Sequence, residues 1–450
     1  MTSGADTWRA GRSSGGRRLV ALLTACLLCV SCATTDLAPV SALGATYRPE
    51  PDELALWSES RAEEDQLLDE ARIYDDPALE RYLQDLVDEL TSPGMAANPE
   101  LRYEVTVLQD PTLNAFAYPH GSLFVHTGLL ARMENEAQLA TVLGHEMSHV
   151  ELRHMLRYRR AAANREIAFT VVAVAALVAL SWEARDAWLE GRDSESDGLA
   201  LLGDLILHLG LPLAVVASVN GYGRRLEREA DHAAFARLAA AGHDLQQAPR
   251  VYEVLQGDET AGDRDLEVFF FGSHPKLEER AATARDWVEE RETTQSPRGD
   301  EPADDRLSQA ERQERFVRHI RPLIVDNALL NLELGRLDLA EEHLLRAQAL
   351  EADDPSLHLA FAQLFLERAD AEPEQQAVHR AAAHAALREA VRLDPERPLP
   401  HRRLGLLLWQ DDELEAACSE LRLYLELDPR APDAPTFHGY VQELEEQGAC

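Results

Sequence analysis

The pentapeptide His145-Glu146-Met147-Ser148-His149 constrains this chain more than any other feature of its sequence. It lies in a segment, Glu136 to Arg153, whose residues favour a helix. Histidines four residues apart lie on one face of such a helix, one turn apart, where both imidazoles can bind one Zn²⁺. Glu146 would then lie beside the metal, as a general base for the water molecule that attacks a peptide carbonyl.

The residues before the first histidine predict that this helix is buried, because they are apolar or small. They are Ala137, Leu139, Ala140, Val142, Leu143 and Gly144. Polar His and Glu side chains inside a core need a compensating interaction, and metal binding is one. The alternative is a solvated helix in which the pattern is accidental.

A catalytic zinc site needs a third protein ligand and leaves its fourth position to water. The segment from about Arg224 to Ala241 is a second predicted helix, on which Glu227 and Asp231 are four residues apart. We predict Glu227 as the third ligand and Asp231 as the acceptor of a hydrogen bond from a liganding imidazole. Glu229 lies on another side and is expected to face solvent. The alternative is an ordinary charged helix face, since carboxylates are common in this chain.

The composition limits the class of protein. The 450 residues allow two to four domains, and the apolar fraction of 45% is enough for real cores. The 80 acidic and 44 basic residues give a net charge of −36, which argues against nucleic-acid binding and against charge-driven binding to an anionic membrane. Few aromatic residues indicate a mostly α protein. Strands are predicted only at 101–107 and 122–126, with turn residues in 114–121 between them.

Residues 1–31 have the pattern of a signal peptide. Arginines precede an apolar run of twelve residues, Leu19 to Val30, which is too short to span a bilayer. The ending Val30-Ser31-Cys32 resembles a bacterial lipobox and predicts a lipid on Cys32, although Cys29 stands where leucine is usual. Ordinary signal-peptidase cleavage and an uncleaved anchor are the alternatives. Residues 32–50 are then expected to be a polar tether, at the periplasmic face of the outer membrane.

Two apolar runs, at 167–182 and 199–219, lie between the two motif-bearing helices. The first is short for a membrane span, and the second contains an acidic residue. We expect helices that pack on the rest of the domain or lie in the lipid interface. A membrane hairpin is the alternative.

Residues 316–450 are predicted to be an all-α repeat array. Asp-Pro pairs at Asp354, Asp394 and Asp428 end helical stretches, and the last interval is 34 residues, the period of a tetratricopeptide repeat. We predict about three repeats, with a degenerate middle repeat and an acidic loop insertion at 369–376. Small residues stand where paired helices approach closely, namely Ala340, Ala347, Ala383, Ala390, Gly405 and Ala417. Chance bundling of helices is the alternative.

The charged, turn-rich residues 291–315 are expected to be the linker before this array. Arrays of this kind bind protein segments in a concave groove, which implies a client or a partner protein. Export from the cytoplasm would also permit a disulfide between Cys418 and Cys450.

Five separated motifs together resemble one family. They are Asn114-Ala115-Phe116-Ala117, Thr127-Gly128-Leu129-Leu130, Leu143-Gly144-His145-Glu146-x-x-His149, Arg224-x-x-Glu227-x-Glu229-Ala230-Asp231 and Ser273-His274-Pro275. Over about residues 50–290 they are similar to the CaaX-prenyl-protease/HtpX family of zinc metalloproteases, and most to its periplasmic branch with tetratricopeptide repeats. The resemblance implies an α+β zincin (gluzincin) domain at 51–290 that holds one Zn²⁺ per chain.

The resemblance also assigns roles to residues. It implies that Glu227 is the third ligand, with Asp231 and Arg224 beside the site, although Gly223 departs from the serine that is usual there. His274 would lie in a loop near the zinc, where it either blocks the open position or steadies the transition state. The segment 114–124 would be an edge strand to which an extended substrate peptide adds.

Three other histidines receive lesser roles. His120 and His126 are expected to be structural or exposed. His154, five residues after His149, is expected on a different helix face as a packing or polar partner.

We therefore expect a zinc endopeptidase of the bacterial cell envelope that degrades misfolded or misassembled envelope and outer-membrane proteins. The repeats would bind unfolded clients or an outer-membrane assembly machine. The alternative is a repeat-containing scaffold or chaperone whose protease domain is latent or regulatory.

Overall fold

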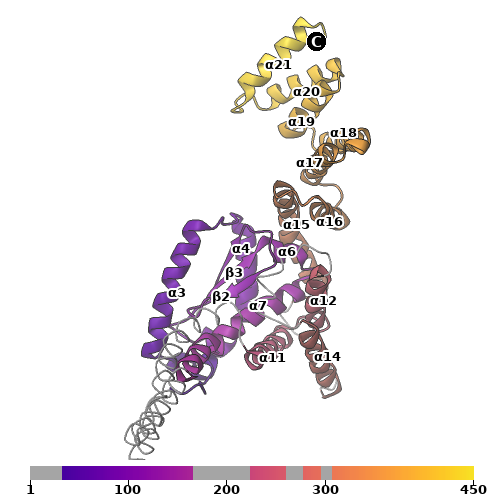
Figure 1. Ribbon diagram of the computed structural model, residues 1–450. Helices are drawn as coiled ribbons and strands as arrows, with labels where there is room; N and C mark the ends of the chain where they lie inside the picture. Colours follow the sequence, from indigo (N-terminus) through magenta and orange to yellow (C-terminus); the bar gives the residue numbers. More distant parts are fainter. Residues whose placement is uncertain (1–32, 166–222, 260–276, 295–306) are drawn as a thin grey trace, which may run out of the picture.

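The computed structural model describes residues 33–165, 223–259, 277–294 and 307–450 (Figure 1). The predicted signal peptide with Cys32, both apolar runs and His274 lie outside these residues. The described chain is mostly helical and contains one small sheet, as predicted. No helix among the described residues combines the length and the apolarity that a membrane span requires.

The predicted tether is wrong, because residues 33–50 are packed on the folded domain. They form the short helix α2, Val40–Leu43, and the 3₁₀ turn η1, Gly44–Thr46. Val40 and Tyr47 are fully buried in the core. Burying each of these two apolar side chains stabilises the docked segment by roughly 1.5–3 kcal/mol.

Two helices follow, α3, Pro51–Glu70, and α4, Pro77–Leu90. The helix α4 starts with Asp76, whose side chain accepts hydrogen bonds from the first-turn amides, and with a proline at its first position. From Leu79 to Leu90 its apolar residues recur at helical spacing and are buried, and this face packs on the sheet and on the later helix α7. A single turn, α5, Pro93–Ala96, precedes the sheet.

The sheet has three strands in the order β1-β3-β2. The strands β1, Glu104–Leu108, and β3, Ser122–His126, are parallel, while β2, Ala115–Ala117, pairs antiparallel with β3. Gly121, with φ of +110°, makes the turn between β2 and β3. The short strand β2 therefore lies at one edge, as the resemblance implied for this segment.

The helices α6, Thr127–Arg132, and α7, Glu136–Glu151, follow the sheet. Asn135 caps α7 by accepting a hydrogen bond from the amide of Gln138. Every residue of α7 except the last is buried. Arg153 has φ of +56°, which ends α7, and residues 154–165 form a further helix.

The helix α11, Arg224–Ala241, has the predicted bounds and packs along α7. At their contact Gly144 of α7 faces Ala234 of α11, and a Cβ on the glycine would lie 3.5 Å from Cα of Ala234, an ordinary contact distance. The helices α12, Gln247–Glu259, and α14, Leu277–Thr294, pack on each other and on this pair.

The C-terminal part is an array of seven helices that extends away from the sheet (Figure 1). They are α15, Gln309–Glu333; α16, Leu337–Leu350; α17, Pro355–Ala371; α18, Gln376–Leu393; α19, Pro398–Gln410; α20, Leu414–Leu427; and α21, Ala434–Glu446. The first six pack as three consecutive pairs, in agreement with about three repeats. A Cβ on Gly405 would lie 2.6 Å from Cδ2 of Leu421, so this close approach requires glycine.

Two details of the predicted array are wrong. Pro355 starts α17 instead of ending a helix, because proline is well tolerated at a first helical position. The expected loop at 369–376 is instead the end of α17, the 3₁₀ turn η2, Pro373–Gln375, and the start of α18. The predicted small residues at 340, 347, 383, 390 and 417 are all fully buried.

The predicted linker 291–315 is too long at both ends. The helix α14 continues to Thr294, and α15 already begins at Gln309 with a capping box formed by Ser308 and Glu311. The helix α15 packs on α4, α6 and α7 as well as on α16, so it belongs to both parts of the protein.

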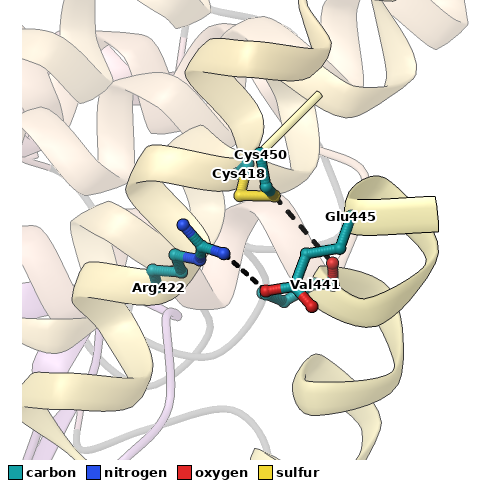
Figure 2. Close-up of a disulfide and its surroundings, with 5 residues drawn as sticks. All are labelled: Cys418, Arg422, Val441, Glu445 and Cys450. Carbon is teal, nitrogen blue, oxygen red and sulfur yellow. Dashed lines mark hydrogen bonds and ion pairs between the residues drawn. A yellow bond between two sulfur atoms is a disulfide. The ribbon is translucent and has the colours of Figure 1, made fainter. Parts of the chain in front are cut away.

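A disulfide joins Cys418 of α20 to the last residue, Cys450, and ties the C-terminus back onto the array (Figure 2). Beside it, Arg422 of α20 and Glu445 of α21 form an ion pair. The pairing that the sequence only permitted is therefore present.

Candidate metal centre

Three side chains from α7 and α11 converge on one point. The Nε2 atoms of His145 and His149 are 2.9 Å apart, and they lie 3.4 and 3.6 Å from the two carboxylate oxygens of Glu227. All three residues are at most 3% exposed. The four-residue spacing on α7 brings the imidazoles together, and the close packing of α11 supplies the carboxylate.

This donor set fits a zinc ion. Zinc bonds of about 2.0–2.1 Å in a tetrahedral arrangement separate ligand atoms by roughly 3.3–3.4 Å, close to the distances between these three side chains. Two imidazoles and one carboxylate are a donor set found in catalytic zinc sites. Glu146, adjacent to His145 on α7, is also buried.

Asp231 orients the first histidine, where the sequence placed it. Oδ1 of Asp231 lies 2.8 Å from Nδ1 of His145, on the side of the ring away from the converging atoms. Burial and Arg280 oppose protonation of His145, but Asp231 and Glu227 outweigh them and raise its pKa to about 9. The carboxylates that attract this proton would attract a metal cation in the same way.

Arg280 of α14 occupies the place beside the site that the sequence gave to Arg224. It donates hydrogen bonds of 3.0 and 2.6 Å to the two oxygens of Asp231, and Tyr252 donates another of 2.9 Å. Despite burial, Arg280 and His145 hold the pKa of Asp231 far below its usual value. Arg224 lies exposed in the first turn of α11, which corrects its predicted position. The sequence did not predict this role for Arg280, and its place shortly after His274 was the signal that could have indicated it.

His154 contacts the second histidine, so its predicted place on a different face is wrong and its predicted role as a polar partner is confirmed. Its Nδ1 lies 3.0 Å from Nδ1 of His149. Glu229, expected to face solvent, is half-buried and accepts a hydrogen bond of 2.6 Å from Arg157.

The histidines of the sheet are structural, as predicted. His120 lies 2.7 Å from a carboxylate oxygen of Glu64 on α3, and His126 lies 2.7 Å from the hydroxyl of Thr112.

A pocket lies between the metal centre and the edge strand. Its lining includes His149 of α7, Ala117 of β2, and Leu56 of α3. The chain past β2 contributes Pro119 to the same lining. The edge of β2 and the candidate metal site therefore border one pocket.

A second cluster of possible metal ligands, Glu89, Glu136 and His243, is an ion network. Arg312 and Arg315 of α15 donate hydrogen bonds to Glu136, and Arg312 also pairs with Glu89. Guanidinium groups thus already neutralise these carboxylates.

Comparison with known proteins agrees with this geometry. Residues 77–288 match the model of Peptidase family M48. The beta-barrel assembly-enhancing protease of Escherichia coli strain K12 is 27% identical over 231 residues, which cover 49% of this chain and 41% of that protein. The mitochondrial metalloendopeptidase OMA1 of Schizosaccharomyces pombe is 30% identical over 191 residues, which cover 42% of this chain and 48% of that protein. OMA1 of Arabidopsis thaliana is 29% identical over 188 residues, which cover 40% of this chain and 30% of that protein.

The fold and the site define a metalloendopeptidase domain. More specifically, residues 77–288, slightly less than half of the chain, are similar to Peptidase family M48. The aligned part spans less than half of the length of the relatives named above.

Proposed function

We propose that this protein is a zinc-dependent endopeptidase of the bacterial cell envelope that degrades misfolded or misassembled envelope proteins. The observation that carries the proposal is the convergence of His145, His149 and Glu227 beside the buried Glu146. The relatives named as beta-barrel assembly-enhancing proteases support the envelope role.

His145, His149 and Glu227 would hold the ion. A zinc ion bound there would supply Lewis acidity toward the substrate carbonyl and would lower the pKa of a water molecule. Glu146 accepts the proton of the attacking water and passes it to the leaving amine. Asp231 keeps the proton of His145 on Nδ1, so that Nε2 stays available as a ligand.

The edge strand β2 is proposed to bind the substrate. An extended peptide can add to the edge of a sheet through main-chain hydrogen bonds, and side-chain pockets then set the preference. Because β2 and His149 border the same pocket, a peptide paired with β2 would pass the metal ligands.

His274 is proposed to act next to the metal, as the resemblance implied. Its two possible roles have opposite signatures. If it blocks the open position, His274→Ala should raise cleavage. If it steadies the transition state, the same change should lower cleavage.

The helix pairs α15–α20 are proposed to be tetratricopeptide repeats that bind clients, or that dock on an outer-membrane assembly machine. The 34-residue interval and the buried small residues between paired helices support this assignment. A lipid on Cys32 is proposed to hold the protein at the periplasmic side of the outer membrane.

The deciding experiment compares wild type with Glu146→Gln on an unfolded substrate protein, with zinc content measured in both. We expect equal zinc content and cleavage about 10²–10⁴-fold slower in the variant, the usual contribution of a general base. Equal cleavage by both proteins would refute the mechanism. A wild type that binds zinc and captures the substrate without cleaving it would favour the scaffold or chaperone alternative.

A further inference from the structure

The second liganding histidine, His149, has an unusual neighbour. Its Nε2 points at His145 and Glu227, while its Nδ1 lies 3.0 Å from Nδ1 of His154. His154 is fully buried. Two ring nitrogens at this distance form a hydrogen bond only when one carries a proton and the other offers a lone pair.

The direction of this hydrogen bond follows from the metal site. If Nε2 of His149 binds the ion, its proton must be on Nδ1, so Nδ1 of His154 is the acceptor and the proton of His154 is on Nε2. That Nε2 faces the carboxylate of Glu229 at 3.6 Å. Arg157 holds this carboxylate by a hydrogen bond of 2.6 Å. The polar contacts therefore run from His149 through His154 to Glu229.

The contact depends on the backbone at Arg153. On a continuous helix, a residue five positions after His149 would point about 140° away from it. Here α7 ends at Glu151 and Arg153 adopts φ of +56°, a conformation that is uncommon for residues other than glycine. The turn starts a new helix at His154 and directs its side chain back to His149.

The N-terminal segment holds this turn. Arg153 donates hydrogen bonds to Glu53 of α3 and, at 3.1 Å, to Glu50. Its guanidinium also lies over the ring of Tyr47, 5.7 Å from the ring centre. Arg153 and Glu53 are both buried, so this ion pair is shielded from solvent.

We propose that His154 is a positioning residue of the metal centre, which fixes the tautomer and the ring orientation of His149 by accepting a hydrogen bond from its Nδ1–H group. The two liganding histidines are thus oriented by different acceptors, His145 by the carboxylate of Asp231 and His149 by a neutral imidazole. Arg153 and its partners on α3 act through the backbone turn that places His154. This inference rests on the proposed zinc site.

The test measures zinc affinity by competition with a chelator, without substrate, in wild type and two variants. His154→Phe fills the space but removes the acceptor. His154→Asn keeps a side-chain oxygen near the position of Nδ1. We expect a 10–100-fold loss of zinc affinity for His154→Phe, the usual effect of removing such a partner, and less than a threefold loss for His154→Asn.

The matched control is His343→Phe. His343 is also buried, and its Nδ1 also accepts a hydrogen bond, from Asn327 at 3.2 Å, but it lies in α16 of the array. Its substitution should leave zinc affinity unchanged. If His154→Phe does not fold, His154→Gln takes its place, because its oxygen matches the position of Nε2 and cannot reach the proton of His149.

Wild-type zinc affinity in His154→Phe, or an equal loss in the Asn and Phe variants, would overturn the inference, since either result leaves no role for the acceptor. A chain that binds zinc tightly but cleaves no protein would refute the proposed function and leave this inference standing.

Discussion

Arg312 of α15 donates a hydrogen bond to Glu136, the first residue of α7, across 2.9 Å. Both side chains are at most 2% exposed. The helix that carries His145 and His149 therefore begins at an ion pair with the first helix of the array. Glu136 is also well placed at a helix N-terminus, where a negative charge is favourable.

Replacing Arg312 should destabilise the whole protein. Arg312→Ala leaves Glu136 and Glu89 with fewer cationic partners, and breaking a buried ion pair costs about 3–5 kcal/mol of the free energy of unfolding. Urea unfolding measures this loss. Arg318→Ala on the same helix is the control, because its pair with Glu314 is exposed and should contribute at most about 0.5 kcal/mol. Equal effects would show that the buried network does not couple the two parts.

Asp231 should control metal binding more strongly than Tyr252 does. Asp231→Asn removes the charge that holds both His145 and Arg280, so zinc affinity should fall by about 10–100-fold. Tyr252→Phe removes one donor to Asp231 and leaves Arg280 in place, so its effect should stay below about tenfold. Chelator competition measures both. A larger loss in Tyr252→Phe would contradict the orienting role of Asp231.

The stability of the array should fall in acid because of His343. Burial, with Arg132 and Arg346 nearby, lowers the pKa of His343 from 6.5 to about 3. Between pH 6.5 and 3, His343 is therefore protonated in the unfolded chain but neutral in the folded chain. The contribution of neutral His343 to the free energy of unfolding is complete above pH 6.5. It is lost as the pH falls toward 3, by up to about 1.4 kcal/mol per pH unit.

Unfolding curves at several pH values test this slope. His343→Phe has no group to titrate and should show a flatter pH dependence between 6.5 and 3. His438→Phe, at an exposed position of α21, should keep the wild-type slope. An unchanged slope in His343→Phe would assign the acid sensitivity to other groups.

The disulfide should stabilise the end of the array and nothing else. Cys418 and Cys450 are 32 residues apart, and closing a loop of this size contributes roughly 3–4 kcal/mol. Cys450→Ser, or a reductant, should lower the melting temperature of the array. Cleavage by the peptidase domain should stay at the wild-type level. A reductant that also destabilised the Cys418→Ser, Cys450→Ser double variant would point to a different cause.

Much of the candidate metal centre was predictable because the residues of each pair lie on the same helix. The spacing of His145 and His149, and that of Glu227 and Asp231, fixes which side chains share a face. Only the packing of α11 on α7 joins the two pairs, and the four-residue spacing of Glu227 and Asp231 made Glu227 a good candidate for the third ligand.

The remaining features depend on contacts between distant segments or on one dihedral angle. Arg280 reaches Asp231 from α14, and no local sequence pattern predicts that contact. His154 faces His149 only because Arg153 takes a positive φ, whereas helical periodicity predicts the opposite face. The docking of residues 33–50 involves the isolated apolar side chains Val40 and Tyr47, and the mostly polar composition of this segment does not predict their burial.

Ala33 is bound to Asn164 through both of its main-chain groups, by hydrogen bonds of 2.9 and 2.7 Å. If Cys32 carries a lipid, a single peptide bond separates the acylated residue from the folded domain. The peptidase domain would then have no flexible tether between it and the lipid. Its cleavage centre could not move far from the bilayer, and substrates far from the membrane would have to be brought to it by the array, which extends away from the peptidase domain (Figure 1).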